Sequence, residues 1–339
     1  MPVMTLETAA LADPVTLAGA LGDGFADPTL LRFDGPAPPD TAPDTRTLLG
    51  RVPAFTLAVG DVPAALADAF DLVAVTDADA ARVEAAFARA PRAAVAAALL
   101  VRHPQPDPWT GLVAESTTYS MLQAGTEFAR WLASHGPPRP ACDDTPRVRV
   151  SRRGRAVEIV LTRPERHNAL DTRMRDELYA ALVGELGATG PIVVRGDGPS
   201  FCSGGDLDEF GTFPDPVTAH LIRLTRSLAR CFSELSPRLV VGVHGACLGA
   251  GIELPAFAAR VVAADDARFG LPELGLGLVP GAGGTVSIPR RVGRQRLLDL
   301  LVRDGTIPAP EAAAWGLVDE VVPRPQLESR VFEIVETMP

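Results

Sequence analysis

Two glycine-rich apolar segments, residues 244–254 and 269–284, most constrain what this chain can fold into. Each carries one glutamate, Glu253 in the first and Glu273 in the second, among Gly, Ala, Ile and Leu. A carboxylate in apolar surroundings loses hydration, so we expect burial to raise its pKa. Two such groups facing one cavity can divide acid and base roles, and glycine lets backbone N–H groups approach a ligand closely. The pattern therefore predicts an enzyme that transfers protons.

The composition excludes several classes of protein. The 339 residues are 47% hydrophobic and 22% charged, which is globular rather than disordered and long enough for about two domains. Acidic residues outnumber basic ones by 42 to 32, and the net charge of −10 argues against a nucleic-acid or membrane partner. All 32 Lys and Arg positions are arginine, so a phosphate-bearing ligand has only Arg, His or backbone N–H as partners.

The cysteines and the N-terminus predict a cytoplasmic protein. The four cysteines form no CxxC pair and stand at no zinc-binding spacing from histidine, so we expect free buried thiols and no metal site; they are Cys142, Cys202, Cys231 and Cys247. Residues 1–20 contain no basic residue, which does not fit a secretory signal. No apolar run approaches the roughly 20 residues of a membrane helix.

A Pro-rich break at residues 136–140 divides the chain into two predicted domains. Residues 1–140 show alternating strand and helix patterns that predict a small α/β domain of unknown role. Residues 141–339 show short strands that alternate with helices at irregular spacing, which predicts an α/β fold of stacked turns.

Some local predictions concern single elements. We expect an exposed loop over 34–47 and continuous helices over 117–134, 216–235 and 249–259. Pro255 lies inside the last of these, removes one helical hydrogen bond and can tilt the turn that carries Glu253.

Four segments from about Val148 to Pro323, about half of the chain, resemble the crotonase superfamily, the enoyl-CoA hydratase/isomerase family. Their sequences are RPERHNAL (163–170), SFCSGGDL (200–207), HGACLGAGIEL (244–254) and PELGLGLVPGAGG (272–284), in the order that the family has them. The resemblance implies a crotonase-like spiral of stacked ββα turns, here preceded by the small α/β domain.

The resemblance also implies roles for site residues. Crotonases bind acyl-CoA thioesters and stabilise a thioester enolate through two backbone N–H groups, which correspond here to Gly205 and Ala250. Ala250 replaces a glycine of the family, but its N–H remains. Glu253 and Glu273 match the glutamates that position and activate water in the hydratases, whereas isomerases commonly keep only the second.

Further residues are expected to hold coenzyme A and the acyl chain. The resemblance implies contacts of CoA with backbone groups at His167, Ala169, Asp206 and Leu207. Arg163 and Arg166 are candidate partners of its phosphates. Phe210, Phe213 and the 211–235 segment are expected to line the acyl pocket. The family needs no metal and no cofactor, because the coenzyme A thioester is the substrate.

The C-terminal end departs from the family pattern. The family continues for several helices after the segment found here at 316–323, and only sixteen residues follow Pro323. Those helices build the family's trimer contacts and close the acyl pocket. The resemblance implies a homo-oligomer, a trimer or hexamer, and the absence of these helices argues against it. We hypothesise that the N-terminal domain takes over some of the covering or assembly.

Three other functions remain open besides an enoyl-CoA hydratase. One is an enoyl-CoA isomerase acting through the same enolate. Another is a cofactor-independent oxygenase of aryl-acetyl-CoA, since some crotonases with an N-terminal extension have that activity. The third is a non-catalytic acyl-CoA-binding subunit, which Ala250, Pro255 and the short C-terminus would support.

Overall fold

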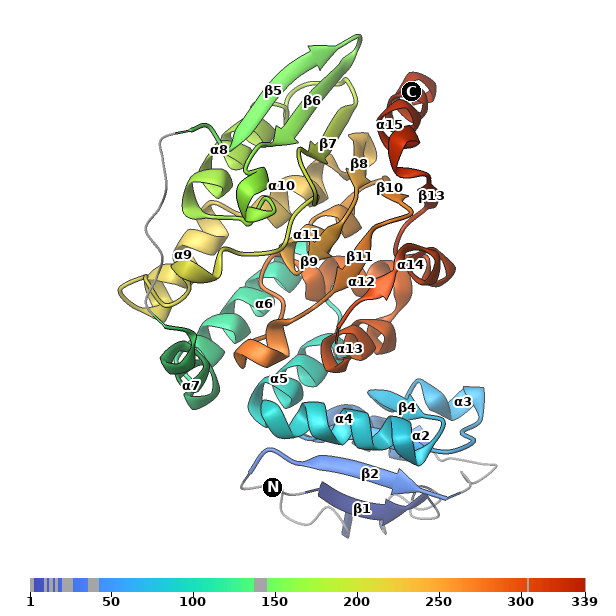
Figure 1. The fold of residues 1–339 in the computed structure, drawn as a ribbon. Helices are drawn as coiled ribbons and strands as arrows, with labels where there is room; N and C mark the ends of the chain where they lie inside the picture. Colours follow the sequence, from blue (N-terminus) through green and yellow to red (C-terminus); the bar gives the residue numbers. More distant parts are fainter. Residues whose placement is uncertain are drawn as a thin grey trace.

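The computed structural model describes residues 3–8, 11, 15, 18–19, 27–35, 43–136, 145–303 and 305–338. Cys142 and most of the break at 136–140 lie outside the described residues. Figure 1 shows a small sheet near the N-terminus at one end of the molecule and the C-terminal helix at the other, with helices of residues 91–123 between them.

The N-terminal region contains a four-stranded parallel sheet in the order β1-β2-β3-β4. Its strands are β1 (Val3–Glu7), β2 (Leu30–Asp34), β3 (Phe55–Val59) and β4 (Leu72–Ala74). Its helices are α2 (Pro43–Arg51), α3 (Ala64–Ala67) and α4 (Asp77–Arg89). Successive residues of β3 face opposite sides, as a strand requires: Leu57 joins one hydrophobic cluster and Ala58 another. The prediction of a small α/β unit is confirmed, but the loop predicted over 34–47 is wrong from Pro43, where α2 begins.

The second region is built around a six-stranded sheet in the order β13-β10-β8-β7-β6-β5. Its strands are β5 (Val148–Arg153), β6 (Ala156–Leu161), β7 (Ile192–Gly196), β8 (Leu239–Val243), β10 (Arg260–Ala264) and β13 (Glu320–Val322). All neighbours are parallel except the β5–β6 hairpin. Helix α15 (Leu327–Thr337) covers one face, where Val331 packs on Val240 and Val262. The other face joins the main hydrophobic core.

A three-stranded sheet in the order β12-β11-β9 forms a separate layer. Strands β9 (Ala246–Leu248) and β11 (Arg268–Gly270) are parallel, and β12 (Ile307–Pro308) is antiparallel to β11. The remaining helices are α8 (Thr172–Val183), α9 (Pro216–Thr225), α10 (Leu228–Leu235), α11 (Ala250–Glu253), α12 (Gly284–Val292), α13 (Arg294–Val302) and α14 (Ala309–Trp315). Single 3₁₀ turns lie at η2 (Pro164–Arg166), η3 (Leu207–Glu209), η4 (Ser236–Arg238), η5 (Pro255–Phe257), η6 (Glu273–Leu276) and η7 (Arg324–Gln326).

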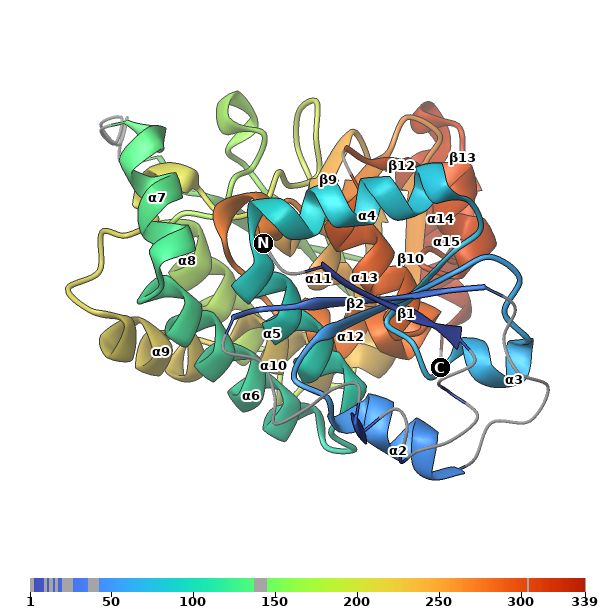
Figure 2. The same ribbon diagram turned by 90° about the horizontal axis from the view of Figure 1, so that it is seen from below.

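Helices α5 (Pro91–Arg102), α6 (Pro108–Gln123) and α7 (Thr126–His135) join the two regions. Helix α6 packs against α9, α10 and α12, α5 against α12 and α13, and α7 against η6. One hydrophobic cluster runs from the N-terminal sheet through these helices into the second region. Seen from below, strands β1 and β2 lie in front of α5 and α12 (Figure 2). Helix α4 contacts α13 and η6, and β4 contacts α13, so the N-terminal residues pack directly on elements that follow residue 145.

Three helices predicted as continuous are broken, each for a local reason. The first divides into α6 and α7, because Gly125 takes an extended conformation (φ −87°, ψ 162°). The second divides into α9 and α10, because the Ser227 hydroxyl accepts the N–H of Arg230 and caps a new helix. The third ends after one turn, since Pro255 has no N–H to donate, and continues as η5.

Candidate active site

Glu253 and Glu273 reach one place because each follows one of two adjacent parallel strands. Strand β9 leads into α11, which ends at Glu253, and β11 leads through Pro272 to Glu273 at the start of η6. Parallel strands present their carboxyl ends at the same edge of a sheet, so the two following turns meet. Both side chains are buried, with 2% and 7% of their surface exposed, and both line one cavity.

Gly249 lies between the two carboxylates. Its backbone (φ 48°, ψ −121°) is one that only glycine adopts readily, and it caps α11. A methyl group built on Gly249 would lie 2.6 Å from Glu273 Oε1 and 3.7 Å from Glu253 Oε1. The bare backbone of this glycine thus leaves room for the two carboxylate oxygens to approach from the same side.

The two carboxylates differ in their hydrogen bonds. Glu253 Oε2 accepts the N–H groups of Ala282 (2.7 Å) and Gly284 (2.9 Å) at the start of α12. Glu273 Oε2 is buried and has no hydrogen-bond partner among the described residues. A buried polar atom without a partner costs free energy, and a ligand or water in the cavity is the partner available to it.

Burial raises the pKa of both groups, as the sequence predicts. Burial raises the pKa of Glu273 to about 8, with a further rise from the charge of Glu115. Burial, with the negative charges of Glu273 and Glu115, raises the pKa of Glu253 well above its usual range. Carboxylates this close cannot all be ionised together, so they titrate as a coupled set and can exchange a proton near neutral pH.

Two backbone N–H groups border the same cavity. Gly205 forms an isolated parallel bridge with Leu170, and Ala250 is the first residue of α11. The hydrogen bonds of the bridge use the carbonyl of Gly204 and the N–H of Asp206, so the N–H of Gly205 is not used by it. The first N–H groups of a helix likewise have no intrahelical partner. No described residue accepts a hydrogen bond from either N–H, and both residues line the cavity.

The cavity has a volume of about 400 Å³ and is bordered mostly by apolar atoms. The structure brings together six of the predicted residues on its wall, namely Gly205, Asp206, Leu207, Ala250, Glu253 and Glu273. Phe210 and Phe213, predicted for the acyl pocket, also line it. Arg163, His167 and Ala169 do not.

The loop that carries these three residues is held by an internal network. Arg163 is buried and its Nη1 bonds the carbonyl of Ala169 (3.0 Å) and Asp206 Oδ2 (2.6 Å), with Asp171 at 3.4 Å. His167 is exposed, lies in the left-handed region (φ 52°) and bonds Ser200. Arg163 therefore fixes the loop beside Asp206 from inside the protein.

Helix α6 contributes cavity residues that the sequence did not predict. Tyr119 and Gln123 line the cavity, one helical turn apart on the same face. The Tyr119 ring packs on Gly281, where an added methyl group would lie 2.5 Å from the ring. Tyr119, Leu122, Phe128 and Leu132 form an apolar pattern that predicts a helix, but the pattern does not show which distant element the helix packs against.

Glu115, also on α6, is a third buried carboxylate. It accepts the N–H of Gly283 (2.7 Å), the N–H of Thr285 (2.9 Å) and the Thr285 hydroxyl (2.6 Å). Glu115 and Glu253 thus hold alternate N–H groups at the start of α12. Burial raises the pKa of Glu115 to about 7 against the opposing effect of these hydrogen bonds.

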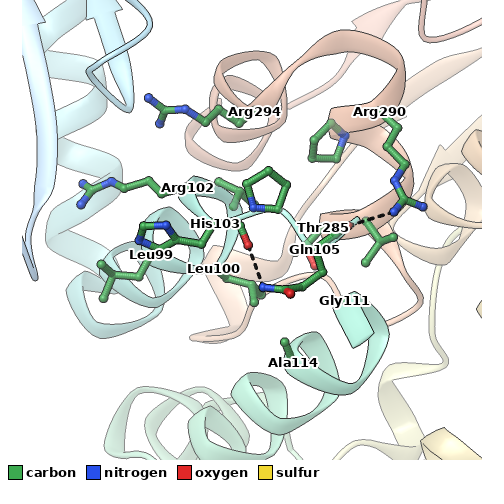
Figure 3. A pocket seen from close by; sticks show the side chains of 14 residues that line it. Leu99, Leu100, Arg102, His103, Gln105, Gly111, Ala114, Thr285, Arg290 and Arg294 are labelled. Atoms are coloured by element: carbon green, nitrogen blue, oxygen red, sulfur yellow. Dashed lines mark hydrogen bonds between the residues drawn. The ribbon is translucent and has the colours of Figure 1, made fainter. Parts of the chain in front are cut away.

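A second cavity of about 470 Å³ lies between α5, α6, α12 and α13 (Figure 3). Figure 3 shows Arg102 and Arg294 directed to one side, towards the N-terminal sheet. Both bond the buried carboxylate of Asp71, and Arg290 bonds the carbonyls of Gln105 and Pro106. These arginines connect protein segments, and we assign the cavity no ligand.

Three further observations concern the described part of the chain. No cluster of three or more His, Cys, Asp or Glu side chains there is arranged to hold a metal ion. None of its helices combines the length and apolarity that crossing a membrane requires. Cys202, Cys231 and Cys247 are buried free thiols, as predicted.

A layered α/β fold with two coupled carboxylates and two unpaired N–H donors around one cavity is the arrangement of an acid–base enzyme that stabilises an oxyanion. Comparison with known proteins identifies the family. The model of the family Enoyl-CoA hydratase/isomerase matches residues 152–339, and the chain belongs to this family. The predicted crotonase-like fold and the prediction of an enzyme of this family are thereby confirmed.

Individual relatives cover the same part of the chain. The probable enoyl-CoA hydratase echA8 of Mycobacterium bovis is 35% identical over 185 residues, which are 53% of this chain and 70% of that protein. The 2,3-dehydroadipyl-CoA hydratase of Escherichia coli is 36% identical over 180 residues, which are 51% of this chain and 68% of that protein.

Solved structures agree with these relatives. The enoyl-CoA hydratase of Thermoplasma volcanium has a TM-score of 0.51 and 33% identity, and the match covers 57% of this chain and 77% of that one. A Thermobifida fusca protein of the family, solved in complex with CoA, has a TM-score of 0.52 and 32% identity. This match covers 56% of this chain and 77% of that one. Each of these matches covers little more than half of this chain.

Proposed function

We propose that this protein is an enoyl-CoA hydratase that adds water to a 2-enoyl-CoA, or removes it in the reverse direction. The observation that carries the proposal is the meeting of Glu253 and Glu273 beside the N–H groups of Gly205 and Ala250 in one cavity. The names of the relatives, several of them enoyl-CoA hydratases, support the same activity.

Each carboxylate has a role that fits its surroundings. We assign the base role to Glu253, which takes a proton from water as the water oxygen adds to carbon 3 of the enoyl group. Its two N–H bonds oppose the rise of its pKa, and the part of that rise caused by the charge of Glu273 is absent while Glu273 is protonated. Glu273 has no such bonds and a pKa of about 8, so its protonated form gives a proton to carbon 2. One proton leaves water and one reaches the product, so a proton shift between the carboxylates restores the starting state.

The thioester oxygen carries the charge that develops during addition. We place it at the N–H groups of Gly205 and Ala250, whose donors are free to bind it. Each donor of this kind lowers a barrier by roughly 3 kcal/mol. The carbonyl returns when carbon 2 is protonated, and the bond to sulfur stays intact.

The CoA portion enters on the side of the 200–207 loop. Asp206 and Leu207 line the cavity there, and the exposed His167 lies on the adjoining loop, so all three keep a role in holding CoA. We propose that Arg163 and the Ala169 carbonyl stabilise this loop through their mutual hydrogen bond. No metal and no cofactor enters the proposed reaction. The homo-oligomeric state and the cytoplasmic location remain predictions.

The proposal is tested by the ultraviolet absorbance of a conjugated 2-enoyl-CoA. We expect wild-type protein to remove this absorbance, and the variants Glu253→Gln and Glu273→Gln to lose at least a hundredfold in rate. Glu209→Gln is the matched control, because Glu209 lines the same cavity but bonds Thr172. It should keep most of the activity.

Each result bears on the proposal. No loss of absorbance with wild type, across short and medium chains, would overturn the hydratase assignment. Conversion of a 3-enoyl-CoA into the conjugated isomer by the same protein would then indicate an isomerase. Tight CoA binding without turnover of either substrate would indicate a binding subunit.

A further inference from the structure

We propose that Arg223, with Tyr119 and Gln123, selects acyl groups that end in a carboxylate. The three side chains form a patch on the cavity wall, which we call the donor patch. The inference rests on the proposed function, because it assumes that an acyl-CoA fills this cavity. It adds the class of acyl group, which neither the fold nor the four motifs specify.

Among the residues that the structure describes, only neutral groups bind the guanidinium of Arg223. Its Nε donates to Ser116 Oγ (3.1 Å), and its Nη1 to Gln123 Oε1 (3.2 Å). Its Nη2 donates to the Ser116 carbonyl (3.3 Å) and to the Ser120 hydroxyl. A guanidinium has five N–H donors, so four are used and one remains on Nη1.

Arg223 has no carboxylate within ion-pair distance among the described residues. Burial lowers its pKa from the ordinary value, which records the cost of holding this charge in the cavity wall. Glu115 exerts a longer-range attraction on it, but the hydrogen bonds of that carboxylate go to Gly283 and Thr285. A buried cation that lacks a counter-ion is stabilised strongly when an anion enters the cavity and pairs with it.

The two neighbours of Arg223 also present donors. Its guanidinium carbon lies 4.6 Å from the centre of the Tyr119 ring, which holds the arginine in place by a cation–π contact. Gln123 gives its oxygen to Arg223, so its amide N–H₂ is left for the cavity. No described residue accepts a hydrogen bond from that amide or from the Tyr119 hydroxyl. The patch therefore offers donors on three groups, the guanidinium, the amide and the hydroxyl, which suits an oxygen-rich anion.

The donor patch lies one aromatic ring away from the glutamates. The Tyr119 ring lies against Gly281 and also against the guanidinium of Arg223. The next residue after Gly281, Ala282, donates its N–H to Glu253. A ligand with its reacting carbons at Glu253 and Glu273 thus reaches Arg223 with the far end of its acyl chain.

Binding of unreactive ligands tests the inference without relying on catalysis. The affinities of saturated acyl-CoAs are compared with those of their ω-carboxy counterparts by calorimetry, at four, six and eight carbons. We expect wild type to bind the ω-carboxy compound at least tenfold more tightly at one or more of these lengths. Arg223→Gln should abolish that preference while binding neutral acyl-CoAs as before, and Arg223→Lys should keep part of it.

Arg226→Gln is the matched control, because Arg226 is the next arginine along the chain, is exposed, and stacks on Tyr179 outside the cavity. It should leave the preference unchanged. Equal affinities for neutral and ω-carboxy compounds at all lengths, or equal losses for both in Arg223→Gln, would overturn the inference. Hydration assays with matched 2-enoyl-CoAs separate the two proposals. Tighter binding of ω-carboxy compounds without any hydration would contradict only the proposed function. Hydration without tighter binding of ω-carboxy compounds would contradict only this inference.

Discussion

Glu115 of helix α6 holds both the backbone N–H and the hydroxyl of Thr285, in the first turn of α12. The bond joins a residue of the N-terminal region to the helix whose start also binds Glu253. A carboxylate at a helix N-terminus is stabilising, and two carboxylates at this one fix its orientation. The N-terminal region therefore takes part in building the site.

Replacement of Glu115 by Gln should shift the pH dependence of the reaction. The negative charge of Glu115 raises the pKa of Glu253 and of Glu273, so its removal lowers both values. We expect the acidic limb of the kcat profile to move to lower pH by roughly half a unit or more. The control is Glu127→Gln, which removes a buried carboxylate that caps α5 and is not among the residues that line the cavity. A change in thermal stability alone, with an unmoved profile, would contradict the coupling.

The buried carboxylates should make the folded state less stable as the pH rises. Their pKa values are raised on folding, to about 7 for Glu115 and about 8 for Glu273, so the folded state binds more protons than the unfolded one. The resulting stability is complete below pH ~4.5 and is lost as the pH rises through these values.

Urea unfolding at pH 5.5 and 8.5 measures this loss. We expect a decrease in the free energy of unfolding on the order of 1–3 kcal/mol between the two, and a smaller decrease in Glu273→Gln. Equal decreases for the variant and wild type would contradict the raised pKa.

The sequence predicts the two glutamates from their local apolar surroundings, and the resemblance to the family implies the two N–H donors, Gly205 and Ala250. Ala250, Glu253 and Glu273 follow strands β9 and β11, whose parallel pairing brings them together. Gly205 joins them through the bridges of its loop, Cys202 with Cys247 and Gly205 with Leu170. Glu115, Tyr119 and Arg223 could not be predicted in this way. Their places in the site depend on the packing of α6 on α9 and α12, which lie about a hundred residues or more away in sequence.

The helix breaks were missed for a related reason. The apolar pattern continues across Gly125 and across Ser227, so periodicity alone predicts one continuous helix through each of these positions. The capping serine at 227 was the local signal for the second break. The buried state of Arg163 had no local signal, because its partners Asp171 and Asp206 meet it only in the folded loop.

Replacement of Gly249 by Ala should nearly abolish activity. The added methyl group would meet Glu273 Oε1 at 2.6 Å in a backbone conformation that alanine disfavours, so the carboxylate must move. We expect a loss of at least a hundredfold in kcat. Gly275→Ala is the control, because Gly275 is two residues from Glu273 and has open space around its Cα. Similar activity of the two variants would contradict the close approach of the Glu273 carboxylate to Gly249.

Replacement of Asp71 by Asn should destabilise the attachment of the N-terminal sheet. Asp71 is fully buried between Arg102 and Arg294, from helices α5 and α13, and its loss leaves two arginines without their counter-ion. We expect a cost of about 3–5 kcal/mol in urea unfolding. Glu328→Gln breaks an exposed pair with Arg153 and should cost less than ~1 kcal/mol. Equal effects would show that the buried pair does not join the two regions.

The proposed joint action of Glu253 and Glu273, in which they add water across the double bond of an enoyl-CoA, can be followed through the oxygen atom of the product. The decisive measurement is mass spectrometry of the product formed in ¹⁸O-labelled water, with wild type and both Gln variants. We expect a 3-hydroxyacyl-CoA that carries one ¹⁸O atom, formed by wild type and lost in both variants. An unlabelled product of unchanged mass, or full labelling by either variant at the wild-type rate, would contradict the proposed roles of the two glutamates.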